Sequence, residues 1–154
     1  MRKVGVLFVC MGNICRSPAA EAIFRAKAAQ RDILDRFSID SCGTGGWHAG
    51  ERADARMQAS ARSRGIELSF RARQITNQCL TSFDHIICMD ADNLRDVQAM
   101  GGDARVQLML AFATKGRRRN VPDPYYGGGD GFALVLDLLD DACEGLLDEL
   151  LQGD

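Results

Sequence analysis

The first 18 residues constrain the fold of this chain more than any other segment. Residues 4–9 form a short apolar run rich in β-favouring residues, which predicts a strand covered on both faces in a parallel sheet. Ser17 and Pro18 follow closely and precede an alanine-rich stretch, a pattern typical of a helix start. Strand, loop and helix therefore meet between Cys10 and Arg16, where backbone N–H groups and the positive end of a helix point to one place.

Cys10 and Arg16 give this loop its expected chemistry. Aligned amides, the helix dipole and a guanidinium all favour the charged form of a thiol, so Cys10 is expected to be a thiolate nucleophile. The same donors fit a tetrahedral oxyanion, and the planar fork of arginine binds two phosphoryl oxygens at once, which a lysine cannot do. Gly12 and Asn13 tolerate the unusual backbone angles that turn successive amides inward. A thiolate below a bound phosphate implies a phosphocysteine intermediate.

The Cys-x5-Arg spacing alone is a weak signal, because a chance match to it is common in a chain with six cysteines and many arginines. The alternative is a small buried cysteine that ends a core strand, with Arg16 as a solvated charge. The strand before the loop and the helix start after it favour the catalytic interpretation. That interpretation predicts the phosphate-binding residues Met11, Gly12, Asn13, Ile14, Cys15, Arg16 and Ser17.

Asp123 is the second candidate catalytic residue. It lies between Pro122 and Pro124, and an aspartate in this setting is, on its own, more often a turn residue. Held beside a bound phosphate, its carboxyl group would protonate the leaving oxygen and then accept a proton from water. The two prolines would restrict the backbone that carries it. Only the partnership with Cys10 favours the role of general acid.

Three aromatic residues are candidate walls of a substrate slot: Trp47, Tyr125 and Tyr126. Such walls would let a long phosphotyrosine reach the thiolate and would hold a phosphoserine too far away. The alternative is ordinary partial burial, and for Trp47 the two interpretations weigh nearly equally.

Several polar residues have two interpretations each. Asn13 and Ser41 are expected to support the loop, while Ser17 either donates to the thiolate or caps the helix. Cys15 either packs under the loop or traps an oxidised Cys10 as a disulfide. The cationic run of Arg117, Arg118 and Arg119 favours a solvated surface, with steering of acidic phosphopeptides as the alternative.

Strand-like and helix-like segments alternate along the chain, which predicts an α/β fold: a single-domain, doubly wound, four-stranded parallel sheet with helices on both faces. Its length of 154 residues and its 46% hydrophobic content suit one domain covering residues 1–154. The other strands are expected at 37–41, 85–89 and 106–110. A helix is expected at 53–64, stopped by Gly65, and another after Asp90, which would cap it. A last helix is expected to present one apolar side, formed by Phe132, Val135, Leu136, Leu139, Cys143, Leu146, Leu147 and Leu150.

Composition excludes several other classes of protein. A net charge of −2 gives no overall attraction to nucleic acid, and the apolar runs are far shorter than the roughly 20 residues that cross a bilayer. The chain shows no signal sequence, and its cysteines show neither a disulfide framework nor a Cys-x2-Cys metal pair. We expect a cytoplasmic protein with reduced thiols and no metal site.

Five segments together resemble the low-molecular-weight protein tyrosine phosphatase family: VLFVCMGNICRSPAAEAIF, DSCGTGGWHAG, ARQIT, FDHIICMD and DPYYGG. The resemblance implies hydrolysis of phosphotyrosine and aryl phosphate monoesters on a tyrosine-phosphorylated protein. It also implies no metal or cofactor, and a monomer or weak dimer. It places Asp123 as the general acid and Trp47 at a position linked to substrate preference. Phe70 departs from the family, because many eukaryotic relatives carry a histidine there that supports the loop.

Two alternatives stay open. An arsenate reductase of the same fold also attacks an oxyanion from a cysteine and then passes a disulfide to further cysteines, for which Cys79 and Cys88 are available. Against it, Cys88 lies in an apolar segment where burial would hinder exchange. A phosphate-binding module without catalysis would require the loss of Cys10, Arg16 or Asp123, and all three are present.

Overall fold

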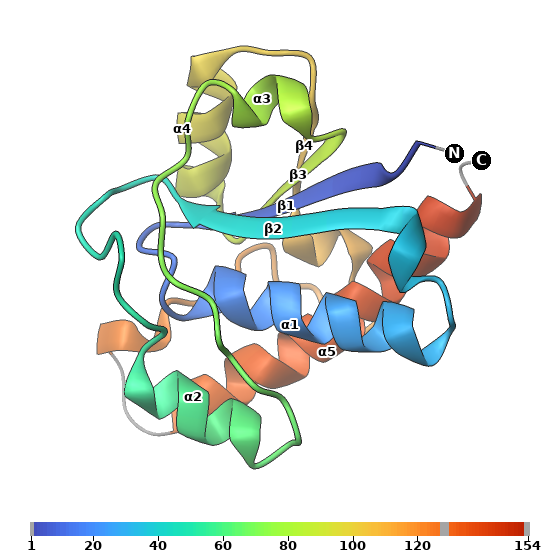
Figure 1. The fold of residues 1–154 in the computed structure, drawn as a ribbon. Coiled ribbons are helices and arrows are strands. Elements are labelled where there is room, and N and C mark those ends of the chain that lie inside the picture. The colour runs from blue at the N-terminus through green and yellow to red at the C-terminus, as the bar shows by residue number, and fades with distance from the viewer. Residues whose placement is uncertain (1, 127–129, 153–154) are drawn as a thin grey trace.

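The computed structural model describes residues 2–126 and 130–152. One parallel sheet has the strand order β2-β1-β3-β4 and consists of β1 (Val4–Cys10), β2 (Phe37–Gly43), β3 (His85–Cys88) and β4 (Arg105–Leu108). One face is covered by α1 (Arg16–Gln30) and α5 (Asp130–Gln152), and α2 (Ala55–Arg62) lies on the same side, farther from the sheet (Figure 1). The other face carries α3 (Cys79–Ser82) and α4 (Ala91–Met100). The predicted doubly wound α/β fold is confirmed.

The central strand β1 explains why its apolar run is unbroken. Val6 and Phe8 point into the core on the α1–α5 side of the sheet, whereas Leu7 and Val9 point into the core on the α4 side. All four side chains have no exposed surface. Because both faces are covered, every position of this strand favours an apolar residue.

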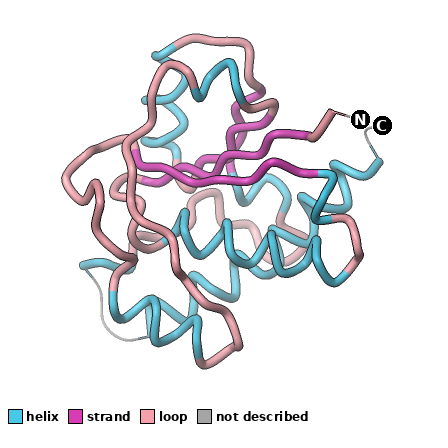
Figure 2. The backbone as a smooth tube through the Cα atoms, in the orientation of Figure 1, coloured by secondary structure: helices cyan, strands magenta, loops and turns pink. Residues whose placement is uncertain are grey.

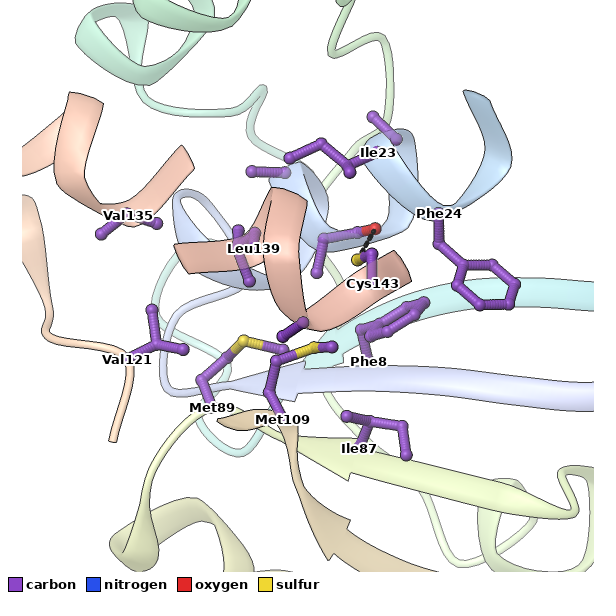
Figure 3. Close-up of a cluster of buried hydrophobic side chains, with 14 of the residues drawn as sticks. Phe8, Ile23, Phe24, Ile87, Met89, Met109, Val121, Val135, Leu139 and Cys143 are labelled. Atoms are coloured by element: carbon purple, nitrogen blue, oxygen red, sulfur yellow. Dashed lines mark hydrogen bonds between the residues drawn. The ribbon is translucent and has the colours of Figure 1, made fainter. Parts of the chain in front are cut away.

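The larger core lies between the sheet, α1 and α5. Figure 3 shows Phe8 and Met89 from the sheet facing Leu139 and Cys143 of α5. The Cys143 thiol donates to the Ala20 carbonyl of α1 at 3.7 Å, which reflects a close approach of the two helices. The predicted apolar side of the last helix is confirmed by its buried residues Phe132, Val135, Leu136, Leu139, Cys143, Leu146 and Leu147.

Element boundaries differ from the predictions at several places, and α2 is shorter than the expected 53–64. β2 continues past Ser41 to Gly43, and β4 ends at Leu108 because the next residues form the 3-10 helix η2 (Met109–Phe112). α1 already begins at Arg16, and its N-cap residue is Cys15, so the interpretation of Ser17 as the N-cap is wrong. Inside the first helical turn the Ser17 hydroxyl is available for contacts with the loop.

Two residues predicted to end or to cap a helix have that role in the structure. Gly65, with φ of +78°, follows α2, and the Ile66 amide donates to the Ala61 carbonyl at 3.0 Å to close its end. Asp90 caps α4 by accepting the Asn93 amide at 2.8 Å, and the two residues form a reciprocal capping box.

The loops that leave the carboxyl ends of the strands gather along one edge of the sheet (Figure 2). Gly43, at the end of β2, lies directly against the loop that follows β1. A Cβ atom on Gly43 would meet the Met11 carbonyl oxygen at 2.7 Å and the Asn13 nitrogen at 3.1 Å. Only glycine therefore allows this close approach. Ligand sites of open parallel sheets lie at this edge.

Candidate active site

The Cys10 sulfur lies at the centre of the loop after β1 and is almost wholly buried, with 2% of the residue exposed. The Asn13 amide donates to it at 3.2 Å, and the Ser17 hydroxyl lies 2.9 Å away. The Asn13 side-chain amide donates to the Ser17 oxygen at 2.7 Å, so the Ser17 hydroxyl can donate to the sulfur, with the Cys42 carbonyl 3.4 Å away as its second acceptor. The Asn13 amide and the Ser17 hydroxyl therefore both lie within hydrogen-bonding distance of the sulfur.

Asn13 holds the loop in shape. Its φ of +58° lies in the left-handed region, as predicted for this residue type. Its side-chain amide donates to the Ser41 hydroxyl of β2 at 3.1 Å and its side-chain oxygen accepts the Arg73 amide at 3.0 Å. The same expectation is wrong for Gly12, whose φ is not positive. A Cβ atom on Gly12 would instead meet the His48 ring at 3.0 Å.

The Arg16 guanidinium is buried and held by three oxygens. One terminal nitrogen donates to Asp90 at 2.7 Å and to the Val121 carbonyl at 3.0 Å, and the other lies 3.6 Å from Asp123. Burial works to lower the pKa of Arg16, but the charges of Cys10, Asp90 and Asp123 more than offset it and raise the pKa. The site therefore keeps a permanent cation beside the sulfur.

Asp123 lies at the mouth of the same pocket, just before the 3-10 helix η3 (Pro124–Tyr126). One carboxylate oxygen accepts the Tyr125 amide at 3.0 Å, and the other faces Arg16. The side chain is 27% exposed. An anchored but accessible carboxyl group can exchange protons with both a bound substrate and water.

These residues surround one small pocket at the edge of the sheet where the strands end. Its wall consists of Cys10, Met11, Gly12, Ile14, Cys15, Arg16, His48, Asp123 and Tyr125. Of the predicted phosphate-binding residues, Asn13 and Ser17 do not line the pocket, because both lie buried behind the loop and hold Cys10. Some side chains of the loop therefore support it from behind, and others face the space where a ligand would bind.

The three predicted aromatic walls differ. Tyr125 lines the pocket, with its ring centroid 6.0 Å from that of His48. Trp47 does not line it: the residue is 70% exposed and its ring lies over Gly45, so its contact with a substrate stays a prediction. The side chain of Tyr126 lies outside the described residues. His48 forms part of the wall, although no sequence pattern singled it out.

Asp90 is the functional residue that sequence reasoning missed. The sequence identified it as a helix cap, and the structure adds that its second oxygen anchors Arg16. A replacement by asparagine should retain the cap, since both residue types cap helices equally well. We expect Asp90→Asn to lower kcat/KM by about 10-fold, because a charge-assisted hydrogen bond to Arg16 is lost.

Asp92→Asn is the matched control for that variant, because Asp92 is exposed on the same helix and pairs only with Arg95 among the described residues. Steady-state kinetics and urea unfolding on both proteins separate positioning from stability. An Asp90→Asn enzyme with unchanged kcat/KM would contradict the anchoring role.

The loop support is built without a histidine. Glu21 of α1 is almost fully buried, and burial raises its pKa despite hydrogen bonding from Ser41 and Arg25. The Arg25 Nε donates to Glu21 at 3.0 Å, and its guanidinium lies 5.7 Å above the Phe70 ring. Arg25 therefore pairs with one oxygen of the buried carboxylate behind Ser41, and Phe70 lies against Arg25.

We expect Arg25→Ala to lower the free energy of unfolding by about 1–2 kcal/mol, because Glu21 is left buried without its cation. The expected loss of stability is modest because the Arg25 side chain is 39% exposed and solvent screens its ion pair with Glu21. Adding Glu21→Gln should recover part of the loss, as urea unfolding would measure. If the losses of stability from Arg25→Ala and Glu21→Gln simply add in the double variant, the two residues are not coupled. Arg36→Ala, at an exposed site, serves as the control.

The remaining cysteines are buried and free. Burial, and next to it the charge of Asp54, raises the pKa of the Cys15 thiol. Burial in β3 raises the pKa of Cys88 to about 12, which disfavours its use in thiol exchange. The disulfide trap between Cys10 and Cys15 stays a prediction.

Residues 2–126 and 130–152 contain no group of three or more histidine, cysteine or acidic side chains placed to hold a metal ion. Within the same residues, none of the helices combines the length and the apolar character that a membrane span requires.

A parallel α/β sheet that places a buried thiol, a buried arginine and a carboxylate around one pocket defines a cysteine-dependent phosphatase, a hydrolase. The family described as low molecular weight phosphotyrosine protein phosphatase matches residues 5–153. The chain belongs to this family of protein tyrosine phosphatases.

Individual relatives agree with this assignment. The low molecular weight phosphotyrosine protein phosphatase of Schizosaccharomyces pombe is 45% identical over 135 residues, which cover 85% of this chain and 86% of that protein. A protein tyrosine phosphatase from Entamoeba histolytica superimposes with a TM-score of 0.95 at 38% identity, covering 98% of this chain and 99% of the other. A drosophila arginine phosphatase superimposes with a TM-score of 0.89 at 31% identity, covering 94% and 96%.

Proposed function

We propose that Cys10, Arg16 and Asp123 hydrolyse phosphotyrosine in proteins in two steps. In the first, the Cys10 sulfur attacks phosphorus in line and forms an S–P bond while the bond from phosphorus to the tyrosine oxygen breaks. Arg16 and the loop amides bind the non-bridging oxygens. Asp123, protonated at this stage, gives its proton to the leaving tyrosine oxygen.

In the second step, water attacks the phosphorus of phosphocysteine. The Asp123 carboxylate accepts a proton from this water, the S–P bond breaks, and inorganic phosphate leaves with the Cys10 thiolate restored. The observation that carries the proposal is the placement of the sulfur, the guanidinium and the carboxyl group around one pocket. Each reacting atom of a phosphate ester then has a partner on the protein.

The depth of the pocket supports an aryl substrate. Cys10 is only 2% exposed, while Tyr125 and Asp123 stand at the mouth. A phosphotyrosine side chain is long enough to pass the ring of Tyr125 and reach the sulfur, whereas phosphoserine is shorter by a whole ring. His48 and Tyr125 would contact the substrate ring. Tyr126 and Trp47 remain candidate contacts for the protein around the phosphotyrosine.

A comparison of phosphopeptides tests the substrate class. One peptide sequence is prepared with phosphotyrosine, phosphoserine or phosphoarginine, since one structural neighbour is named an arginine phosphatase. Turnover is measured in the presence of EDTA. We expect rapid phosphate release from the phosphotyrosyl peptide only. Preference for phosphoarginine, or activity that requires an added metal ion, would contradict the proposal, as would arsenate reduction without phosphatase activity.

We also propose the cellular setting. The chain acts as one domain over residues 1–154, in the cytoplasm, without a cofactor, as a monomer or weak dimer whose partners are phosphoproteins and not nucleic acids. Free thiols at all six cysteines support a reducing compartment. A net charge of −2 supports the absence of a nucleic-acid partner.

A further inference from the structure

A short basic loop connects η2 to the segment that carries Asp123. Four of its five residues are cationic: Lys115, Arg117, Arg118 and Arg119. All four are exposed, and within the described part of the chain none forms an ion pair. Most of the other arginines of this protein do pair with acidic groups. Lys115 lies beside Asp141 of α5, whereas Arg117, Arg118 and Arg119 present positive charge without an ion-pair partner among the described residues.

Both ends of the basic loop are fixed to the body of the protein. At its start, Asp141 of α5 accepts the amides of Thr114 and Lys115 at 2.9 and 3.1 Å. At its end, the Asn120 side chain accepts the first amide of α4 at 2.9 Å, and the Val121 amide donates to the Met89 carbonyl at 2.8 Å. Fixed ends keep the cations in one region, so less conformational freedom is lost when a partner binds.

The basic loop lies next to the active site. The Val121 carbonyl contacts Arg16 at 3.0 Å, and consecutive Cα atoms are about 3.8 Å apart, so the Arg119 Cα lies within about 8 Å of the Val121 Cα. An extended peptide advances about 3.3–3.6 Å per residue. Acidic side chains about three to five positions from a bound phosphotyrosine would therefore reach the cations of the basic loop.

From these observations we infer that the basic loop is a docking surface for an acidic segment of the phosphoprotein, adjacent to its phosphotyrosine. This inference rests on the tyrosine phosphatase function proposed above. Phosphotyrosine holds the segment at the pocket, and the basic loop then selects substrates by their flanking charge.

A partner with an extended anionic surface, such as a membrane or a nucleic acid, fits the basic loop less well than an acidic peptide. Beside Lys115, the Asp137 and Asp140 carboxylates of α5 pair with Arg64 and Lys27, so this side of the basic loop offers no excess positive charge to a membrane or a nucleic acid. The stretch from Ala113 to Val121 contains no aromatic side chain on which bases could stack. A short acidic peptide avoids both problems.

The test uses the variant Arg117→Gln/Arg118→Gln/Arg119→Gln and three phosphotyrosyl peptides of equal length. Two carry glutamates on one side of the phosphotyrosine, either before or after it, and the third carries glutamines. At low salt, we expect the variant to raise KM for one of the acidic peptides by about 5- to 10-fold with kcat unchanged, as three rim ion pairs would give. KM for the neutral peptide and for a small aryl phosphate should not change.

Salt and a matched control complete the test. Raising the salt concentration should remove the preference of the wild type for the acidic peptide. The control variant Arg36→Gln/Arg62→Gln/Arg95→Gln removes three exposed arginines elsewhere and should behave as the wild type.

Equal KM values for all three peptides in the wild type would overturn the docking surface, while their turnover would leave the phosphatase function intact. The docking surface would also be overturned, and the phosphatase function left intact, if the variant loses binding to anionic vesicles or RNA but not to peptides. Failure of the wild type to release phosphate from any peptide would instead contradict the proposed function.

Discussion

Replacement of Cys10 by serine is expected to lower turnover of phosphotyrosyl peptides by at least about 10⁴-fold. A serine hydroxyl is a far weaker acid and a poorer nucleophile than a thiol, and the contacts from the Asn13 amide and the Ser17 hydroxyl are too few to stabilise an alkoxide. The reaction then has no nucleophile although the phosphate-binding groups remain. Steady-state kinetics with a phosphotyrosyl peptide measures this loss.

Binding and stability measurements keep that result interpretable. The Cys10→Ser protein should still bind inorganic phosphate, since Arg16 and the loop amides are unchanged. It should also unfold at nearly the same urea concentration as the wild type. Cys143→Ala, which removes a buried thiol from the core between α1 and α5, should retain activity in the folded protein. Substantial turnover by Cys10→Ser would rule out a phosphocysteine mechanism.

Replacement of Asp123 by asparagine should slow the enzyme according to the leaving group. Phosphotyrosine leaves as a basic oxygen and requires a proton, so its kcat should fall by about 10²- to 10³-fold. A nitrophenyl phosphate, which releases a much weaker base, should lose only about 10-fold. The asparagine side chain can still accept the Tyr125 amide, so the loop geometry is retained.

Asp103→Asn, an exposed change before β4, is the control for that comparison and should have no effect with either substrate. Asp123 acts as a general acid only if Asp123→Asn lowers kcat by different factors for the two leaving groups. Equal losses for both would show that Asp123 binds or orients substrate without acting as a general acid.

Much of this architecture could be predicted because the relevant signals are local. The unbroken apolar run of β1 follows from burial on both faces, and the Asp90 cap and the Gly65 stop are encoded within a few residues. The loop after β1 combines strand, turn and helix signals within 18 residues. The amino-acid sequence was therefore enough to predict that Cys10 and Arg16 share one pocket.

Other features depend on contacts between distant segments, which a single sequence does not reveal. Asp90 is 74 residues from Arg16, and its carboxylate was identified only as a cap. The guanidinium of Arg25 lies over Phe70, which is 45 residues away in the sequence. The strand predicted to reach Leu110 ends earlier, because η2 turns toward α5, where a Cβ atom on Gly145 would lie 1.9 Å from the Phe112 carbonyl oxygen.

The most direct test of the whole account is to trap the phosphoenzyme. Wild type and Cys10→Ser are mixed with a phosphotyrosyl peptide, quenched within milliseconds, digested and analysed by mass spectrometry. The account predicts one phosphoryl group on Cys10 in the wild type, formed together with a burst of released tyrosyl peptide, and none in the variant. Phosphate attached to another residue, or a burst without phosphorylated Cys10, would contradict it.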